Sequence, residues 1–181
     1  MKRNYIFIAE VKTISPFGWQ STLSWEQLFE LANQHGDMIS IHTDPRWGGS
    51  FELLAKARQL TDKPILAKGI HETDDHIRQA LDAGANQVLV VGRQPVEFLD
   101  HCILEPLTLQ ELSEYPQGVK ALWNSRDLAT GNLKQETFAQ ARSLWNGWLC
   151  QASNISDQSD VQAGTDAILV GTHLPEFVRA I

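Results

Sequence analysis

Two charged residues of opposite sign end the first apolar run of the chain. Residues 6–12 read IFIAEVK, so Glu10 and Lys12 continue the two-residue spacing of Ile6 and Ile8. If the run is a strand, all four side chains share one face, because alternate residues of a strand point the same way. A carboxylate and an ammonium group that follow an apolar interior in this way suggest acid–base chemistry.

Three later apolar runs end in the same pattern, each with a polar residue two positions after an apolar one. These polar residues are Lys68, Glu105, Asn124 and Arg126. For any one of them alone, a solvated strand end or a compensating ion pair is the simpler interpretation. As a set in one partly desolvated cleft, they would shift one another's pKa values, so that a lysine can donate a proton and a glutamate can hold one.

Two short polar turns follow the last two apolar runs, QASNIS at 151–156 and VGTHLP at 170–175. Each leads toward a short helical segment, whose first backbone N–H groups favour an anion. Loops after strands seven and eight of an eight-stranded α/β barrel often bind a phosphate group. Each turn alone is a weak signal, because Gly-Thr and Ser-Asn pairs also occur in ordinary turns.

The elements that must position these residues are short, β-branched runs bounded by turn residues, a pattern typical of strands. We predict eight strands, at 6–12, 38–44, 64–70, 87–92, 101–106, 119–126, 148–153 and 167–173. Segments with helical spacing lie between them, most clearly at 24–36, 50–61, 73–84 and 134–145. Strand and helix alternate, which predicts parallel strands joined by right-handed crossovers.

Eight such units predict a closed (β/α)8 TIM barrel that forms a single domain over residues 1–181; an open α/β sheet is the runner-up. Such barrels usually have about 200 residues or more. We therefore expect a minimal barrel with shortened helices and no N-terminal extension. The short segments 95–100, 159–164 and 174–181 would serve as helices four, seven and eight.

Composition excludes several classes of function. The chain is 43% apolar and 20% charged, which is ordinary for a globular protein. Its net charge is −7 and it has no basic cluster, so we expect no nucleic-acid partner. No segment reaches the ~20 apolar residues that cross a bilayer, and no signal-peptide core is present, so we expect a cytoplasmic protein. Its cysteines and histidines lack metal-ligand spacing, so we expect buried thiols and no metal site.

Taken in order, the motifs resemble those of the indole-3-glycerol phosphate synthase family over nearly the whole chain. The matching segments are IAEVKTISPFG, TDPRWGGSFELL, PILAKGI, ILEP, WNSRDLATG, QASNI and ILVGTHL. E-V-K-x-x-S-P and N-S-R-D-L are fairly specific, and the others gain weight from their order. The resemblance implies a lyase of tryptophan biosynthesis that needs no cofactor. Its substrate would be a carboxyphenylamino-deoxyribulose phosphate, cyclised with loss of carbon dioxide and water.

The resemblance also implies roles for five catalytic residues. Lys68 would be the general acid that protonates the substrate carbonyl as the aromatic ring attacks. Glu105 would be the second acid–base group and serve the dehydration, and Lys12 would pair with the phosphate or assist proton transfer. Glu10 would orient the lysines, and Asn124 would hydrogen-bond the developing hydroxyl.

A further set of residues would bind the substrate: Ser15, Trp47, Arg126, Ser153, Asn154, Gly171 and Thr172. Ser15 and Arg126 would contact polar groups, and Trp47 would lie beside the ring, while the last four fall on the phosphate-binding turns. Two histidines near strand ends, His42 and His173, could reach the pocket, but we interpret both as hydrogen-bonded structural residues.

Four features depart from the family's pattern. The seventh strand ends Ala152-Ser153-Asn154 in place of Glu-Ser-Gly, which removes a carboxylate, although asparagine tolerates positive φ better than most residues. Lys68-Gly69-Ile70 replaces Lys-Asp-Phe and removes an aromatic wall. We expect no counterpart of the family's N-terminal extension, and we expect helices four, five and eight to be short. The mouth would then exclude water poorly.

The sequence therefore supports three candidate functions of different class. The first is an active, minimal indole-3-glycerol phosphate synthase-like lyase; the alternative is a phosphosugar-binding barrel with lost or altered chemistry, and another phosphosugar lyase or isomerase is a third. Four retained polar residues favour the first, because buried polar groups cost stability; they are Lys12, Lys68, Glu105 and Asn124. Ala152 and the expected lack of the N-terminal extension favour the second. In each case we expect a small sugar phosphate as ligand, and a second copy or another protein would cover apolar surface that short helices expose.

Overall fold

Eight short parallel strands close into a barrel in the computed structural model, which describes residues 3–181. The strands are β1 (Ile6–Val11), β2 (Met38–His42), β3 (Ile65–Lys68), β4 (Gln87–Val91), β5 (Cys102–Glu105), β6 (Lys120–Asn124), β7 (Leu149–Ala152) and β8 (Ala167–Val170). Each strand pairs with the next along the chain, and β8 pairs with β1. The predicted closed barrel is confirmed, and the open sheet is wrong.

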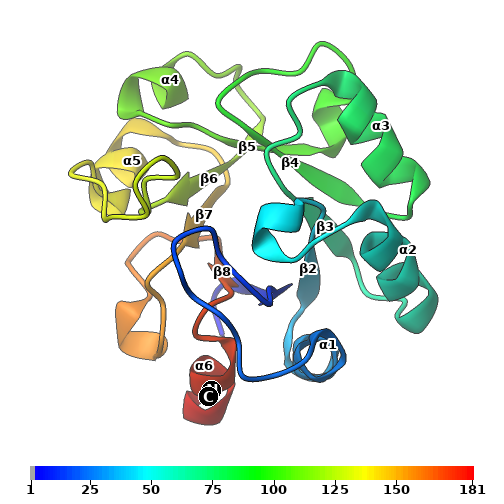
Figure 1. Cartoon of the computed structure of the whole chain (residues 1–181). Helices are drawn as coiled ribbons and strands as arrows, with labels where there is room; N and C mark the ends of the chain where they lie inside the picture. Colours follow the sequence, from blue (N-terminus) through cyan, green and yellow to red (C-terminus); the bar gives the residue numbers. More distant parts are fainter. Residues whose placement is uncertain (1–2) are drawn as a thin grey trace.

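Helices surround the strands (Figure 1). They are α1 (Trp25–His35), α2 (Phe51–Leu60), α3 (Asp74–Asp82), α4 (Leu109–Ser113), α5 (Phe138–Leu144) and α6 (Leu174–Ala180). A serine or threonine hydroxyl caps the start of each helix from α1 to α5, as the sequence pattern indicates for the longer ones. Within residues 3–181, no helix has both the length and the apolar character that a membrane span requires.

Two of the expected helices are wrong. The connections from β4 to β5 and from β7 to β8 contain single 3-10 turns, η2 (Leu99–His101) and η3 (Gln158–Asp160), where we expected helices at 95–100 and 159–164. The carboxylate of Asp74 accepts the N–H groups of Val96 and Glu97, at 2.9 Å each, and Phe98 has a φ of 65°. The left-handed conformation of Phe98 interrupts a right-handed helix here, and the hydrogen bonds to Asp74 fix the residues before it.

The helix expected at 134–145 begins later, at Phe138. The N–H of Lys134 donates to the carbonyl of Ser125, which keeps the preceding residues in the loop after β6. The expected helix at 174–181 is present as α6, which contacts α1 on the outside of the barrel (Figure 1).

The strands separate two apolar layers, because alternate residues face opposite sides of the sheet. The layer inside the barrel contains Ile8, Leu66, Leu89, Ile103, Leu122, Cys150, Ala152, Ala167 and Leu169. The layer between strands and helices is larger and includes Phe7, Ile39, Leu54, Ile77, Trp123 and Phe177. Cys102 and Cys150 are buried free thiols, as predicted. In β1, β3, β5 and β6, the inward residue that follows this layer, two positions further along the strand, is polar. These polar residues form the site.

Candidate active site

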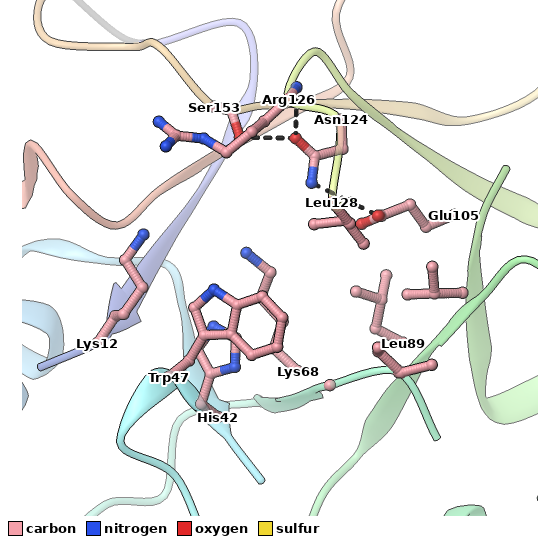
Figure 2. Close-up of a pocket in the computed structure, with 13 residues that line it drawn as sticks. Lys12, His42, Trp47, Lys68, Leu89, Glu105, Asn124, Arg126, Leu128 and Ser153 are labelled. Atoms are coloured by element: carbon pink, nitrogen blue, oxygen red, sulfur yellow. Dashed lines mark hydrogen bonds between the residues drawn. The ribbon is translucent and has the colours of Figure 1, made fainter. Parts of the chain in front are cut away.

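Four polar side chains from four strands or strand ends line one cavity at the carboxyl end of the barrel. They are Lys12, Lys68, Glu105 and Asn124, and the cavity holds about 450 Å³ of empty space. Figure 2 shows the two lysines on one side of this cavity and Glu105 with Asn124 on the other. The wall also contains an apolar group of residues, namely Ile70, Leu89, Val91 and Leu128. The structure thus brings together residues as far apart in the chain as Lys12 and Asn124.

Glu10 lies below this cavity as a buried anchor for positive charge. Only 1% of the residue is exposed, and its carboxylate accepts hydrogen bonds from Lys68 Nζ at 3.1 and 3.2 Å. Its Oε1 also lies 2.5 Å from Nε2 of His42. Burial raises the pKa of Glu10, but the attraction of Lys68, Lys12 and His42 outweighs this, so the pKa lies well below its usual range. Glu10 is therefore ionised.

The ammonium group of Lys12 lies between the loop after β1 and the turn after β8. Its ammonium group donates to Thr172 Oγ1 at 2.7 Å and lies 5.1 Å from the ring centre of Trp19. Burial lowers the pKa of Lys12 to about 8; Glu10 opposes this shift, and the positive charges of Lys68 and Arg126 add to it. Lys12 can thus bind an anion at neutral pH and release its proton at mildly alkaline pH.

Glu105 has the opposite protonation preference from Glu10. It is 1% exposed, its Oε2 accepts from Asn124 Nδ2 at 3.4 Å, and its Oε1 has no partner among the described residues. Burial raises the pKa of Glu105, against the smaller effects of Lys68 and Lys134. This carboxyl group is therefore suited to hold a proton, which Glu10 is not.

Asn124 connects Glu105 to the loop that follows β7. Its Oδ1 accepts hydrogen bonds from Ser153 Oγ at 2.6 Å and from the N–H of Arg126 at 2.9 Å (Figure 2). Its Nδ2 is thereby directed toward Glu105. The asparagine amide is fixed on both sides, and one edge of the cavity is rigid as a result.

A second cavity of about 330 Å³ adjoins the first, and four residues line both: Lys12, Lys68, Arg126 and Ser153. The turns after β7 and β8 add Asn154, Gly171, Thr172 and His173, and the rest of the lining is Glu10, Ile155, Leu169 and Val170. Ser153 and Asn154 have φ values of 72° and 57°, so Asn154 takes the left-handed conformation anticipated at this position. The cavity combines cationic side chains with hydroxyl groups and turn backbone, which suits a phosphate group.

Gly171 allows Glu10 to approach the second cavity. A Cβ atom at position 171 would lie 2.3 Å from Glu10 Oε2, closer than real Cβ contacts. Any side chain here would displace the carboxylate that holds Lys68. The turn after β8 and the ion pair of Glu10 with Lys68 therefore depend on one another.

Trp47 and Ser15 occupy different surroundings. Trp47, in the 3-10 turn η1 (Pro45–Trp47), lines the first cavity and stacks on His42, with ring centres 5.6 Å apart and planes at 7°. Ser15 lines neither cavity, and its Oγ accepts from the N–H of Phe17 at 3.0 Å. The structure thus places Ser15 in a turn of the loop after β1, away from the other site residues.

Two of the four departures in sequence have visible consequences in the site. Ala152 is 1% exposed and packs in the apolar layer inside the barrel, so a methyl group occupies the place of the missing carboxylate. A Cβ atom at Gly69 would lie 2.6 Å from Thr43 Oγ1, so position 69 has no room for a larger residue without rearrangement. Ile70 lines the cavity as an aliphatic wall in place of an aromatic one.

His42 lines the cavity, although we did not include it among the candidate site residues from sequence. It lines the first cavity and contacts Glu10, whereas we interpreted it as a structural histidine. The signal was present in β2, because Ser40 and His42 continue the inward alternation that marks the other strand ends. Its partner is on β1, and this could not be read from β2 alone.

Comparison with known proteins decides the family. Residues 1–121 match the family model described as "Indole-3-glycerol phosphate synthase". The chain belongs to the indole-3-glycerol phosphate synthase family. The matched range contains Lys12, Lys68 and Glu105, which line the first cavity, and Glu10, which contacts Lys68.

Individual indole-3-glycerol phosphate synthases are similar to this chain at modest sequence identity. The enzyme of Campylobacter concisus is 28% identical over 142 residues, which cover 76% of this chain and 50% of that protein. The enzyme of Thermococcus kodakarensis is 32% identical over 102 residues, covering 51% and 44%. An alignment with the Staphylococcus aureus enzyme, 27% identical over 197 residues, covers 96% of this chain and 75% of that protein. The chain spans half or less of the length of the first two of these synthases in these alignments.

Proposed function

We propose that the protein is a lyase of the indole-3-glycerol phosphate synthase type that acts in tryptophan biosynthesis. Its substrate would be a carboxyphenylamino-deoxyribulose phosphate. The observation that carries the proposal is the presence of Lys68 and Glu105 in one cavity, with Glu10 holding the lysine and burial raising the pKa of Glu105. The reaction requires one group that protonates a carbonyl oxygen and a second that serves the loss of water.

In the first step, Lys68 donates a proton from Nζ to the carbonyl oxygen as the ring carbon that carries the carboxylate attacks the carbonyl carbon. A carbon–carbon bond forms, and the carbonyl becomes a hydroxyl group, which Asn124 hydrogen-bonds. Carbon dioxide then leaves, and the electron pair of the broken bond restores the aromatic ring. Glu10 keeps Lys68 at the cavity during this step, because two of its contacts to Nζ are within 3.2 Å.

In the second step, Glu105 supplies the proton with which the hydroxyl group leaves as water. The substrate releases one proton as the indole ring forms, so protons balance. The raised pKa of Glu105 favours its protonated form before this step. Its position against Asn124 places the acid beside the residue that holds the hydroxyl group.

The two adjoining cavities suit the two ends of this substrate. The apolar wall, formed by Ile70, Leu89, Val91 and Leu128, would contact the aromatic ring together with Trp47. Lys12 and Arg126 would pair with the phosphate in the second cavity, and Ser153, Asn154, Gly171 and Thr172 would surround it. For Ser15 we propose an indirect role, through the shape of the loop after β1.

Incubation of the protein with this substrate tests the proposal. We expect an increase in indole fluorescence, and we expect calorimetry to show binding of a sugar phosphate. The absence of both signals would contradict the proposal. Sugar-phosphate binding without turnover would contradict the lyase and favour the second candidate described next.

The second candidate is a phosphosugar-binding barrel of the same family with lost or altered chemistry. Ala152 favours it, because the apolar interior extends to the end of β7 where the family carries a glutamate. The second cavity does not depend on that carboxylate, so binding would persist without the reaction.

A further inference from the structure

His42 lies at the end of β2, between the carboxylate of Glu10 and the indole ring of Trp47. Its side chain is 5% exposed and that of Glu10 is 2% exposed, so both groups of the pair are shielded from water. The distance from His42 Nε2 to Glu10 Oε1 is 2.5 Å. The indole of Trp47 covers one face of the imidazole in a stacked arrangement. The histidine is therefore held on its polar edge and on its flat face.

The partners of His42 determine which ring nitrogen carries the proton. Nδ1 is buried and has no hydrogen-bond partner among the described residues, whereas Nε2 faces an ionised carboxylate. Burial lowers the pKa of His42, the negative charge of Glu10 opposes this, and Lys68 and Lys12 add to the lowering. The ring is accordingly neutral near pH 7 and donates its single N–H from Nε2 to Glu10.

This hydrogen bond restricts the carboxylate that holds Lys68. Glu10 Oε1 lies between His42 and Lys68, and Oε2 accepts from Lys68. Removal of the His42 donor would free the carboxylate to rotate, and Lys68 would move with it. Nδ1 of His42 contacts no further donor or acceptor among the described residues, so no protein group there continues a proton relay through the ring.

We propose that His42 is a positioning residue for Lys68: it donates Nε2–H to Glu10 and so fixes the carboxylate that places the lysine in the cavity. This inference rests on the proposed function for the part that concerns turnover. His42 also lines the cavity, but in this role it acts on Lys68 through Glu10.

Two substitutions separate positioning from packing. His42→Gln keeps an amide N–H near the place of Nε2, whereas His42→Leu fills a similar volume without a donor. We expect kcat of His42→Leu to fall roughly 10- to 100-fold with little change in KM, as is usual when a group that orients a catalytic residue is removed. His42→Gln should restore kcat to within about threefold of wild type. The matched control is His101→Leu, an exposed histidine at the opposite end of β5 from the cavity.

Side-chain NMR tests the same claim without turnover. Nitrogen-15 shifts of the histidines should show His42 as the Nε2–H tautomer at pH 7. The carbon signal of Lys68 Cε, identified by its loss in Lys68→Met, should shift in His42→Leu and stay near its wild-type position in His42→Gln and His101→Leu. An Nδ1–H tautomer, an unmoved Lys68 signal in His42→Leu, or wild-type kcat in that variant would overturn the inference. A wild-type protein without turnover would overturn the proposed function, while the NMR result would still decide the role of His42.

Discussion

Glu10 and Glu105 are equally buried, but their neighbours give the two carboxyl groups opposite protonation preferences. Glu10 contacts Lys68 and His42 and is ionised. Glu105 contacts the neutral amide of Asn124, and burial raises its pKa. Enzymes divide acid and base work between two such groups by this kind of difference in surroundings. At this scale we assign proton storage to Glu105 and the holding of cations to Glu10.

The charge on Lys12 should control phosphate binding. Because its pKa is about 8, Lys12 is a cation below that pH and becomes neutral as the pH rises through it. We expect the affinity for a sugar phosphate to fall above pH 8 by up to about tenfold per pH unit. Calorimetric titrations at several pH values from about 7.5 to about 9.5 measure this change in affinity. In Lys12→Met binding should be weaker throughout and this pH dependence should disappear; its persistence would assign the titration to another group.

The turns after β2 and β3 contact one another and fix the backbone of Lys68. Thr43 donates its backbone N–H to the carbonyl of Lys68 at 2.8 Å, and Thr43 Oγ1 lies 2.8 Å from Nε2 of His71. Nδ1 of His71 donates to the carbonyl of Leu89 at 2.5 Å, so Nε2 accepts the proton of Thr43. The backbone at Lys68 is thereby tied to β2 and β4, and Gly69 leaves room for this contact.

Gly69→Ala should disturb that support. The new Cβ atom would lie 2.6 Å from Thr43 Oγ1 and 3.2 Å from His71 Cε1. We expect a loss of about 1–3 kcal/mol in the free energy of unfolding, as is typical of overpacking, measured by urea denaturation. The double variant Thr43→Ala, Gly69→Ala should cost less than the sum of the single variants, because the atom that clashes is gone. Strict additivity would show that the contact between these residues is not the cause.

Much of the strand pattern was predictable from local sequence, because a β-branched run with period two carries its own signal. All eight strands lie within the predicted ranges, and inward alternation at Glu10, Lys68 and Glu105 predicted the cavity. The missing helix at 95–100 was not predictable locally. Asp74, more than twenty residues earlier, accepts the N–H groups of Val96 and Glu97, and such a tertiary contact leaves no mark in the segment itself.

The same distinction applies to the site. The parity of a strand reveals which residues point inward, and this was sufficient for Lys12 and Asn124. It does not reveal which neighbour a side chain meets across the barrel. His42 contacts Glu10 on the adjacent strand, and Ser15 accepts a hydrogen bond within its own loop, and neither partner could be read from the strand pattern.

For the whole molecule, closure of the barrel completes the site. The family model covers residues 1–121, whereas Asn124 and the turns after β7 and β8 lie beyond that range. Pairing of β8 with β1 brings Thr172 to 2.7 Å from Lys12, across 160 positions of sequence. The second half of the chain therefore contributes the turns of the second cavity, for which we propose phosphate binding.

The stability of the whole barrel should depend on pH through His71. Burial lowers the pKa of this histidine to about 4 from its ordinary 6.5. Below pH 6.5 the unfolded chain takes up a proton that the folded protein refuses until about pH 4, so the free energy of unfolding should fall by about 1.4 kcal/mol per pH unit in this window. The total contribution is about 3 kcal/mol, lost as the pH falls.

Urea denaturation between pH 7 and 4 checks this prediction, with His71→Asn as the comparison. Asparagine accepts the φ of 52° at this position and does not titrate. The slope in His71→Asn should be smaller by about 1.4 kcal/mol per pH unit, while the contribution of His42, whose pKa burial also lowers, remains. Equal slopes in the two proteins would show that His71 is protonated without cost in the folded state.

The central claim is that Lys68 donates a proton in the cavity, and kcat of Lys68→Met in the indole fluorescence assay tests it most directly. Methionine keeps the length of the side chain and removes the proton, and the matched control is Lys56→Met on α2, whose exposed pair with Glu26 contributes little. We predict that Lys68→Met lowers kcat by roughly 10²- to 10⁴-fold, the usual size of a general-acid contribution, and that Lys56→Met retains wild-type kcat. Wild-type kcat in Lys68→Met would contradict the account.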